Sequence, residues 1–322
     1  MKTVFLGTPE PAVPFLHKTR ELTDLGLVLT NADRCCGRGM NLTCCPVKAA
    51  ALEAGLTVLT PEKSMQEVQS AVAEFAPDLG IVVACGHFLK PDFLATARYG
   101  YINIHFSLLP KYRGAAPVQW SLINGETETG VTAFWITKGM DTGDIFMRRK
   151  LDIKPEDDAA SLMRRLTELG VEVLADTINA VKSGRVIRMP QQGEPTFARM
   201  FTKDDAWLDF NMPAAAVHNR VRGLALGPRA KALLTLADGR TTSVQFVKTS
   251  VWNKTGRGGL KPGQLVRIET GYGIIIQCSK STELCVSEVR PEGKNTIPAR
   301  DFFFGMKLKS GDVFSGGPAR PE

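Results

Sequence analysis

The sequence predicts an α/β protein in which a Rossmann-like, mostly parallel sheet is followed by a second, small β-barrel domain. Short apolar segments alternate with helical segments through the first half of the chain, which is the pattern of a parallel sheet with helical crossovers. Past residue 207, five short strand-like segments follow one another closely, and that number suits a small barrel. The 322 residues, of which 43% are hydrophobic, are enough to bury the cores of two domains.

The first half opens with an apolar strand at residues 3–6, a tight turn at Gly7-Thr8-Pro9 and a helix that ends near Leu22. Prolines near the start of that helix are tolerated because the first turn has no use for their missing N–H. No Gly-x-Gly-x-x-Gly motif follows the strand, so a nicotinamide cofactor is disfavoured. Further strands are expected at residues 26–30, 57–59, 78–84 and 101–105, and helices at residues 46–54 and 157–183.

A Pro- and Gly-containing linker at residues 189–206 is expected to separate a catalytic domain at residues 1–188 from a basic β-barrel domain at residues 207–322. The second domain should begin with a helix at residues 213–222, with Asn211 as its N-cap. Its strands are expected at residues 231–236, 242–249, 264–269, 272–278 and 284–289, with a hairpin turn at Asp238-Gly239.

Charge is distributed unevenly along the chain. Residues 206–322 contain 17 Lys and Arg against 9 Asp and Glu, whereas residues 1–205 contain 23 against 24. A basic domain beside a neutral one favours a polyanionic partner, nucleic acid before membrane, although plain solubility is an alternative explanation. No apolar run approaches the ~20 residues of a membrane span, and the N-terminal segment fits a first strand better than a signal peptide.

Seven cysteines, an odd number without framework spacing, fit a reducing compartment and predict a cytoplasmic protein. Four of them, Cys35, Cys36, Cys44 and Cys45, form two vicinal pairs. Vicinal pairs lack the Cys-x-x-Cys spacing that lets two thiolates face one zinc ion, so we expect these four to act as small hydrophobic residues.

The candidate chemistry lies in residues 101–117. Alternation along the strand at residues 101–105 places Asn103 and His105 on one face, and the prolines and glycine that follow predict a loop beyond the strand end. An amide donor and an imidazole are the groups needed to hold a developing oxyanion and to move a proton. A structural histidine is the commoner explanation for the pair alone, but Asp141, in a Gly-flanked turn between apolar runs, is able to orient and charge His105.

Several motifs together resemble one enzyme family. Asn-x-His at 103–105, Ser-Leu-Leu-Pro-x-Tyr-Arg-Gly-Ala-Ala-Pro at 107–117, Thr-Gly-Val-Thr at 129–132 and Asp-Thr-Gly-Asp-Ile at 141–145 are similar to the 10-formyltetrahydrofolate-dependent formyltransferases, over residues 5 to about 303. The resemblance implies that a formyl group passes from 10-formyltetrahydrofolate, a co-substrate, to the α-amino group of initiator methionyl-tRNA. It also implies an oligonucleotide-binding-like barrel, a monomer, no metal, and Asn103, His105 and Asp141 as catalytic residues.

The resemblance implies a folate site beside this strand. Cys85 and Phe106 stand where the family usually has other residues, Tyr and a small side chain respectively, so the packing around folate is expected to differ in detail. The residues expected to bind folate are Ser107, Leu108, Leu109 and Pro110, with Gly86, Phe88 and Leu89 from the segment after the central strand.

The segment at residues 31–45 is longer than a usual crossover loop, and loops of that length tend to be functional. Its Arg34 and Arg38, with neighbouring glycines, suit phosphate contacts. Family members that act on tRNA carry such an arginine loop, which the resemblance implies contacts the acceptor arm. Lys254 and Arg257, in a Gly-rich loop of the basic domain, are further candidates for tRNA contacts, and a solvated surface is the alternative.

Two other functions fit parts of the sequence. A formyltransferase for a sugar-nucleotide amine would share Asn103, His105 and Asp141 but would not need the arginine loop or the basic domain. A non-catalytic RNA-binding protein on the same scaffold would need no intact set of catalytic residues.

Overall fold

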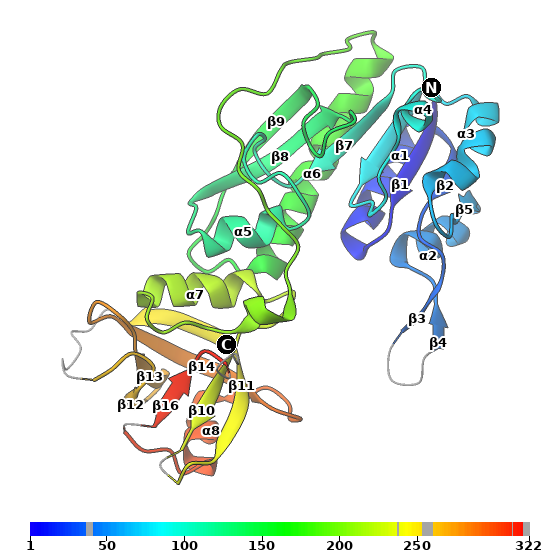
Figure 1. Cartoon of the computed structure of the whole chain (residues 1–322). Helices are drawn as coiled ribbons and strands as arrows, with labels where there is room; N and C mark the ends of the chain where they lie inside the picture. The colour runs from blue at the N-terminus through cyan, green and yellow to red at the C-terminus, as the bar shows by residue number, and fades with distance from the viewer. Residues whose placement is uncertain (37–40, 237, 253–259, 311, 318–322) are drawn as a thin grey trace, which may run out of the picture. The chain divides into compact units, whose positions relative to one another are not determined.

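The computed structural model describes residues 1–36, 41–236, 238–252, 260–310 and 312–317 (Figure 1). The chain divides into two compact units. The first comprises Met1–Pro117, Glu128–Asp152 and Met163–Ala198, and the second comprises Val118–Thr127, Ile153–Leu162 and Arg199–Glu322. Two short segments of the first half therefore group with the C-terminal unit, and the domain boundaries expected from the sequence stay a prediction.

The first unit is built on a seven-stranded sheet whose first five strands run parallel, and whose sixth strand is antiparallel to both of its neighbours. All five residues of its central strand are buried, as expected for a parallel strand covered on both faces. In the last strand, two buried residues are followed by alternating half-buried and exposed residues, as expected for a strand at the sheet edge with one face towards solvent. The strands lie in the order β5 (Thr57–Leu59), β2 (Asp24–Leu29), β1 (Lys2–Gly7), β6 (Leu79–Val83), β7 (Tyr101–His105), β8 (Glu128–Trp135) and β9 (Ile145–Asp152).

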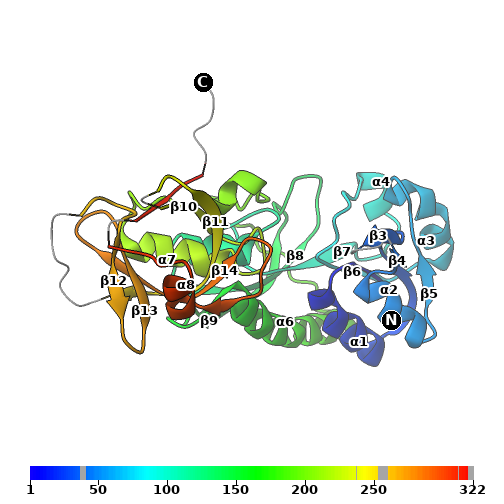
Figure 2. The ribbon, with the colours of Figure 1, turned by 90° about the horizontal axis from the view of Figure 1, so that it is seen from below.

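Helices follow most of the parallel strands, and three of them begin at a start signal in the sequence. Proline occupies the first turn of α1, α2 and α4, where no N–H is needed. Helices α1 and α6 lie side by side (Figure 2), and at Gly170 an added Cβ would come within 2.7 Å of the Phe15 ring. The helical elements are η1 (Glu10–Ala12), α1 (Val13–Leu22), α2 (Pro46–Glu53), η2 (Met65–Val68), α3 (Gln69–Phe75), α4 (Pro91–Leu94), α5 (Pro117–Ile123) and α6 (Ala159–Lys182).

The second unit is an antiparallel barrel. Its sheet runs in the order β12 (Leu265–Glu269), β13 (Gly273–Gln277), β14 (Glu283–Pro291), β11 (Thr241–Trp252), β10 (Lys231–Thr235) and β16 (Val313–Ser315), with β15 (Ile297–Pro298) beside β14. Leu265 N–H donates to the Asp312 carbonyl at 2.8 Å and Phe314 N–H donates to the Gly263 carbonyl at 2.8 Å, so β16 closes the barrel against the start of β12. The remaining helices are η3 (Lys203–Ala206), α7 (Ala214–Gly223) and α8 (Ala299–Gly305).

The predicted fold class, a mostly parallel Rossmann-like sheet with a second small barrel, is confirmed. Two details differ from the expectation. The segment at residues 31–45 contains an antiparallel pair, β3 (Arg34–Cys36) and β4 (Asn41–Thr43), rather than loop alone. Helix α7 has Pro213 rather than Asn211 as its N-cap, without a side-chain hydrogen bond, and the Asn211 amide donates to Asp209. None of the described helices combines the length and apolarity that a membrane crossing requires.

Candidate active site

Strand β7 carries two of the predicted catalytic side chains to the carboxyl end of the parallel strands, where ligands bind in open α/β sheets. In register with β8, Asn103 lies opposite Phe134 and His105 lies opposite Thr132. Asn103 Oδ1 is buried, and the described part of the chain offers it no hydrogen-bond partner. A buried acceptor without a partner is costly, so this oxygen is available to a donor on a bound substrate.

The His105 ring is 7% exposed and is held by the backbone. Its Nε2 lies 2.9 Å from the Tyr112 carbonyl oxygen, and the ring meets Phe134 edge-on. A carbonyl only accepts hydrogen bonds, so Nε2 carries a hydrogen and Nδ1 is the nitrogen left to gain or lose a proton. The Tyr112 carbonyl thus holds one nitrogen of the ring, and the expected role of Asp141 in orienting the ring stays a prediction.

Asp141 faces the free nitrogen of the ring. Its Oδ2 lies 3.8 Å from His105 Nδ1, which is too long for a hydrogen bond but close enough for an ion pair with the protonated ring. The same oxygen accepts the Gly114 N–H at 2.7 Å. The structure therefore brings together His105 and Asp141, which are 36 residues apart, as the sequence predicted.

The loop after β7 is a tightly bonded turn. The Ser107 hydroxyl donates to the Lys111 carbonyl at 2.6 Å, and the Ser107 carbonyl accepts the Thr132 hydroxyl at 2.6 Å. Ser107 and Leu109 are fully buried, Pro110 is buried and Leu108 is half-buried. The Ser107 and Leu109 side chains therefore stabilise the turn that presents the Tyr112 carbonyl, and contact of residues 107–110 with folate stays a prediction.

The segment after β6 follows the strand that pairs with β7 in the sheet. Phe88 is 60% exposed and Gly86 is exposed, whereas Leu89 is buried in the core of the first unit. His87 Nε2 contacts Asn31 Oδ1 at 2.7 Å, which ties this segment to the end of β2. Burial raises the pKa of the Cys85 thiol, so this cysteine is a poor nucleophile.

Sequence reasoning missed three groups at the site. The Tyr112 carbonyl and the Gly114 N–H lie inside the recognised motif, but main-chain groups carry no sequence signal. Gln191 was assigned to the linker, yet its side-chain amide hydrogen-bonds the carbonyl of Asp141 at 2.8 Å. A separation of 50 residues and the absence of any local pattern left Gln191 undetectable.

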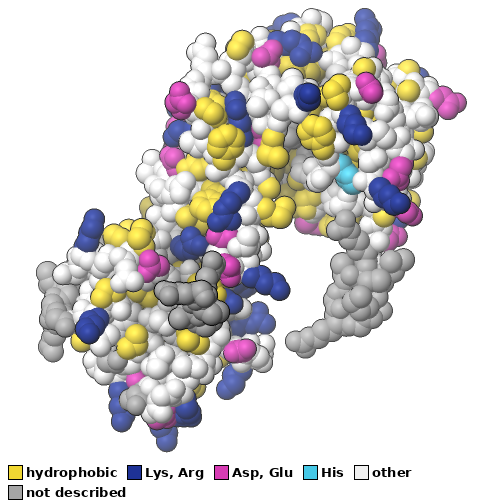
Figure 3. All heavy atoms as spheres, viewed as in Figure 1, with side chains coloured by type: hydrophobic (Ala, Val, Ile, Leu, Met, Phe, Trp, Pro, Cys, Tyr) yellow, Lys and Arg dark blue, Asp and Glu magenta, His cyan; other side chains and the backbone are white. Residues whose placement is uncertain are grey.

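Most residues expected to bind tRNA cannot be placed. Arg38, Lys254 and Arg257 lie outside the described residues, and Arg34 begins β3 with only its backbone described. Lys and Arg side chains are nevertheless spread over the barrel unit's surface in Figure 3.

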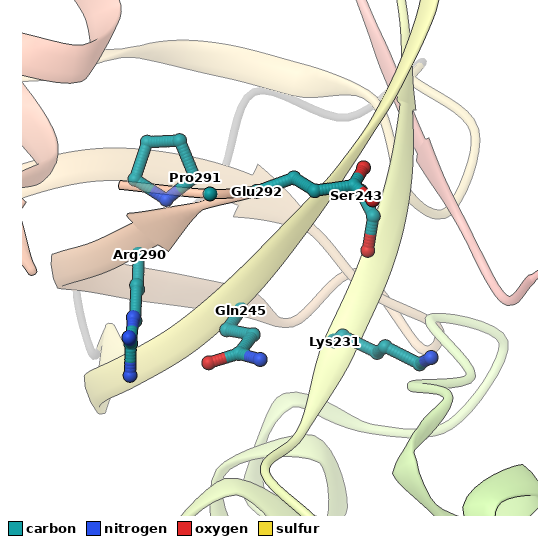
Figure 4. A pocket seen from close by; sticks show the side chains of 7 residues that line it. Lys231, Ser243, Gln245, Arg290, Pro291 and Glu292 are labelled. Carbon is teal, nitrogen blue, oxygen red and sulfur yellow. The ribbon is translucent and has the colours of Figure 1, made fainter. Parts of the chain in front are cut away.

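The barrel unit also holds a polar pocket of about 330 Å³ (Figure 4). Lys231 on β10 and Arg290 on β14 supply two cations to it, and the Lys231 ammonium lies 4.0 Å from the centre of the Trp207 ring. Gln245 Oε1 is buried with no hydrogen-bond partner among the described residues. The other lining residues are Ser243, Pro291, Glu292 and Gly293.

Within the described part of the chain, no group of three or more His, Cys, Asp or Glu side chains is arranged to hold a metal ion. Cys44 and Cys45 are free and half-buried, and Cys45 Sγ lies 2.9 Å from the Thr30 hydroxyl. The cysteine pairs expected to act as small hydrophobic residues are therefore described only in part, because the side chains of Cys35 and Cys36 are not placed.

Comparison with known proteins gives matches over both units. The formyl transferase family profile matches residues 1–178, and the formyl transferase C-terminal domain profile matches residues 200–307. Methionyl-tRNA formyltransferase of Elusimicrobium minutum is 43% identical over 97% of this chain and 99% of its own. The protein of the same name from Geobacter metallireducens is 40% identical over 97% of each chain.

Solved structures share the fold at low identity. An N-formyltransferase from Helicobacter canadensis, in complex with folinic acid and dTDP-3-aminofucose, has a TM-score of 0.66 at 17% identity, over 89% of this chain and 98% of its own. HypX from Aquifex aeolicus, in complex with tetrahydrofolic acid, has a TM-score of 0.61 at 16% identity, over 100% of this chain and 49% of its own.

Proposed function

The chain belongs to the formyl transferase family, and on that premise we propose that it transfers the formyl group of 10-formyltetrahydrofolate to the α-amino group of initiator methionyl-tRNA. The observation that carries the proposal is the convergence of Asn103, His105 and Asp141 at the carboxyl end of β7. Relatives named methionyl-tRNA formyltransferase, 37–43% identical over 97% of this chain, support the tRNA acceptor.

In the proposed reaction, the amine nitrogen attacks the formyl carbon and the bond from that carbon to N10 breaks. An α-amino group has a pKa of about 7.7–8.0, so a useful fraction is neutral near pH 7 and no covalent enzyme intermediate is needed. The attack generates an oxyanion, which the Asn103 amide and the positive charge of protonated His105 stabilise. The Asp141 carboxylate takes up the proton that the amine releases, and protonated His105 gives its Nδ1 proton to the leaving N10. Transfer of a proton from Asp141 to His105 then restores both groups.

The residues around β7 fit a folate co-substrate. Asn103 Oδ1 is a buried acceptor that the described residues leave unpaired, and Phe88 presents an exposed aromatic ring beside the same sheet edge. We assign the folate site to Gly86, Phe88 and Leu89 together with residues 107–110. This site supplies an apolar wall and main-chain hydrogen-bonding groups rather than a metal.

The proposed tRNA contacts are Arg34 and Arg38 in the segment at residues 31–45 and Lys254 and Arg257 in the basic domain. The pocket at Lys231 and Arg290 supplies two more cations on the barrel unit. We propose that a barrel domain at residues 207–322 holds the RNA and that a catalytic domain at residues 1–188 performs the transfer, joined by residues 189–206. The protein is proposed to act as a monomer in the cytoplasm.

The test is a parallel incubation of the purified protein and 10-formyltetrahydrofolate with Met-tRNA or with an amino-sugar nucleotide. The proposal predicts formyl-methionyl-tRNA and no formylated sugar. Formylation of the sugar alone would assign the chain to the sugar-nucleotide reaction. Product from neither acceptor in a single-turnover assay would support a non-catalytic RNA-binding role.

A further inference from the structure

Asp141 occupies a backbone conformation that is uncommon for a residue other than glycine. Its φ is 52°, in the left-handed region that disfavours residues other than glycine. A side chain on such a residue is correctly aimed only if its surroundings hold the backbone in place. The position of the Asp141 carboxylate opposite His105 therefore depends on contacts to the Asp141 main chain as well as on the hydrogen bond from Gly114 N–H.

Those contacts come from Gln191. Its Nε2 donates to the carbonyls of Asp141 and Gly143, each at 2.8 Å. Its Oε1 accepts from Arg113 Nη2 at 2.7 Å and from Arg113 Nε at 3.3 Å. The amide cannot be flipped, because guanidinium nitrogens only donate and carbonyl oxygens only accept.

The backbone on both sides of Gln191 is fixed. Met189 exchanges two hydrogen bonds with Ile145, at 2.7 and 3.0 Å. Farther along, Arg113 N–H donates to the Thr196 carbonyl at 2.8 Å and Ala198 N–H donates to the Arg113 carbonyl at 2.7 Å. Gln191 is thus held between the turn that carries Asp141 and the loop that carries Tyr112 and Gly114.

We propose that Gln191 is a positioning residue of the active site, which sets the distance between the Asp141 carboxylate and His105 Nδ1. The proposal rests on the proposed function only in taking Asp141 as catalytic. The side-chain hydrogen bonds of Gln191 go to Arg113 and to the carbonyls of Asp141 and Gly143 rather than to His105. It acts through the main chain of Asp141 on one side and through Arg113 on the other.

Replacement by glutamate isolates the donor half of this contact. Gln191→Glu keeps an acceptor for Arg113 but places a carboxylate against two carbonyl oxygens, so Asp141 is pushed away. We expect kcat for Met-tRNA to fall roughly tenfold, with KM for the folate donor within about twofold of wild type. Gln191→Leu loses both the donor and the acceptor of the amide, so its kcat should fall at least as far. Gln192→Glu, at an exposed neighbouring position, is the matched control and should keep wild-type kcat.

A double variant separates positioning from general stability. If Gln191 acts through Asp141, Gln191→Glu combined with Asp141→Asn should lose little more kcat than Asp141→Asn alone, because the aimed carboxylate is already gone. A loss equal to the product of the two single losses would overturn the proposal. So would a Gln191→Glu variant that keeps wild-type kcat and changes only its melting temperature.

A second readout does not depend on the acceptor. The chain has four histidines, and His105→Gln identifies the His105 ring signals in an NMR spectrum of labelled protein. At pH 7, the ring ¹⁵N shifts of His105 should move in the same direction in Gln191→Glu and in Asp141→Asn, and should stay in place in Gln192→Glu. Unchanged His105 shifts in Gln191→Glu would overturn the positioning role of Gln191, whichever amine the protein formylates. Failure of the wild-type protein to formylate Met-tRNA would overturn only the proposed function.

Discussion

Replacing Asp141 by asparagine should lower kcat for formyl transfer by roughly 10²- to 10³-fold while the protein stays folded. Asp141 Oδ2 lies 3.8 Å from His105 Nδ1. Two opposite unit charges at that separation attract by about 4 kcal/mol at an effective dielectric constant of about 20, against about 1 kcal/mol in bulk water. The Asp141 side chain is only 14% exposed and the His105 side chain 7%, so the attraction of about 4 kcal/mol is the better guide. Its loss from a charged transition state corresponds to a rate lower by up to about three powers of ten.

The asparagine variant removes the negative charge of residue 141 but keeps the hydrogen bond to Gly114. Its amide oxygen still accepts the Gly114 N–H, whereas Asp141→Ala leaves that N–H without its partner and should lose a further ~1–3 kcal/mol of unfolding free energy. Single-turnover formylation of Met-tRNA measures the first effect and urea unfolding measures the second. Asp24→Asn, an exposed carboxylate at the start of β2, is the control for loss of charge. A kcat for Asp141→Asn within about threefold of wild type would refute the assignment of Asp141 to the charge of His105.

Three further predictions concern the RNA and the second unit. If the basic domain holds tRNA by phosphate contacts, KM for Met-tRNA should rise steeply with salt concentration. Lys231→Ala or Arg290→Ala should make that rise less steep. A KM for wild type that does not change with salt would remove the argument from charge for a nucleic-acid partner. Arg38→Ala should lower kcat/KM for Met-tRNA by about ten- to a hundredfold with little change in melting temperature, and Arg38→Lys should restore only part, because an ammonium cannot reproduce a fork of donors. Hydrogen bonds from Arg199 hold the pKa of the Asp205 carboxyl well below its usual range. The ionised carboxyl therefore stabilises the fold above about pH 4, and this contribution is lost as pH falls. In urea unfolding, Asp205→Asn should be less stable than wild type at pH 7 and should differ less from wild type at pH 3.

The parts of the fold that the sequence predicted are those governed by local patterns. The strand expected at residues 101–105 coincides with β7, because β-branched residues alternate with Asn103 and His105 between a glycine and a proline-rich loop. Helix α6 lies within one or two residues of its expected bounds, since its apolar stripe repeats at the helical period. In both elements, neighbouring residues alone carry the signal.

The parts that were missed depend on partners distant in sequence. Strand β16 has three residues, too few for a periodic pattern, and exists because it closes the barrel between β10 and the start of β12. Gln191 looks like an ordinary linker residue until the turn at Asp141 is brought beside it. The identity of the catalytic residues remains a prediction from motif and geometry, and the kinetic experiments above are its test.

The two residues whose groups face the His105 ring nitrogens both have a left-handed backbone conformation, and residues of the predicted linker hydrogen-bond to both of them. Tyr112, whose carbonyl contacts Nε2, has φ of 60°, and Asp141, whose carboxylate faces Nδ1, has φ of 52°. Each left-handed residue costs roughly 1–2 kcal/mol relative to an ordinary conformation, so each needs a compensating contact. Tyr112 N–H donates to the Thr196 hydroxyl at 2.8 Å, and the Asp141 carbonyl accepts from Gln191. Both contacts come from one ten-residue stretch, Met189 to Ala198, so if His105 and Asp141 are catalytic, this stretch supports the active site in addition to joining the two proposed domains.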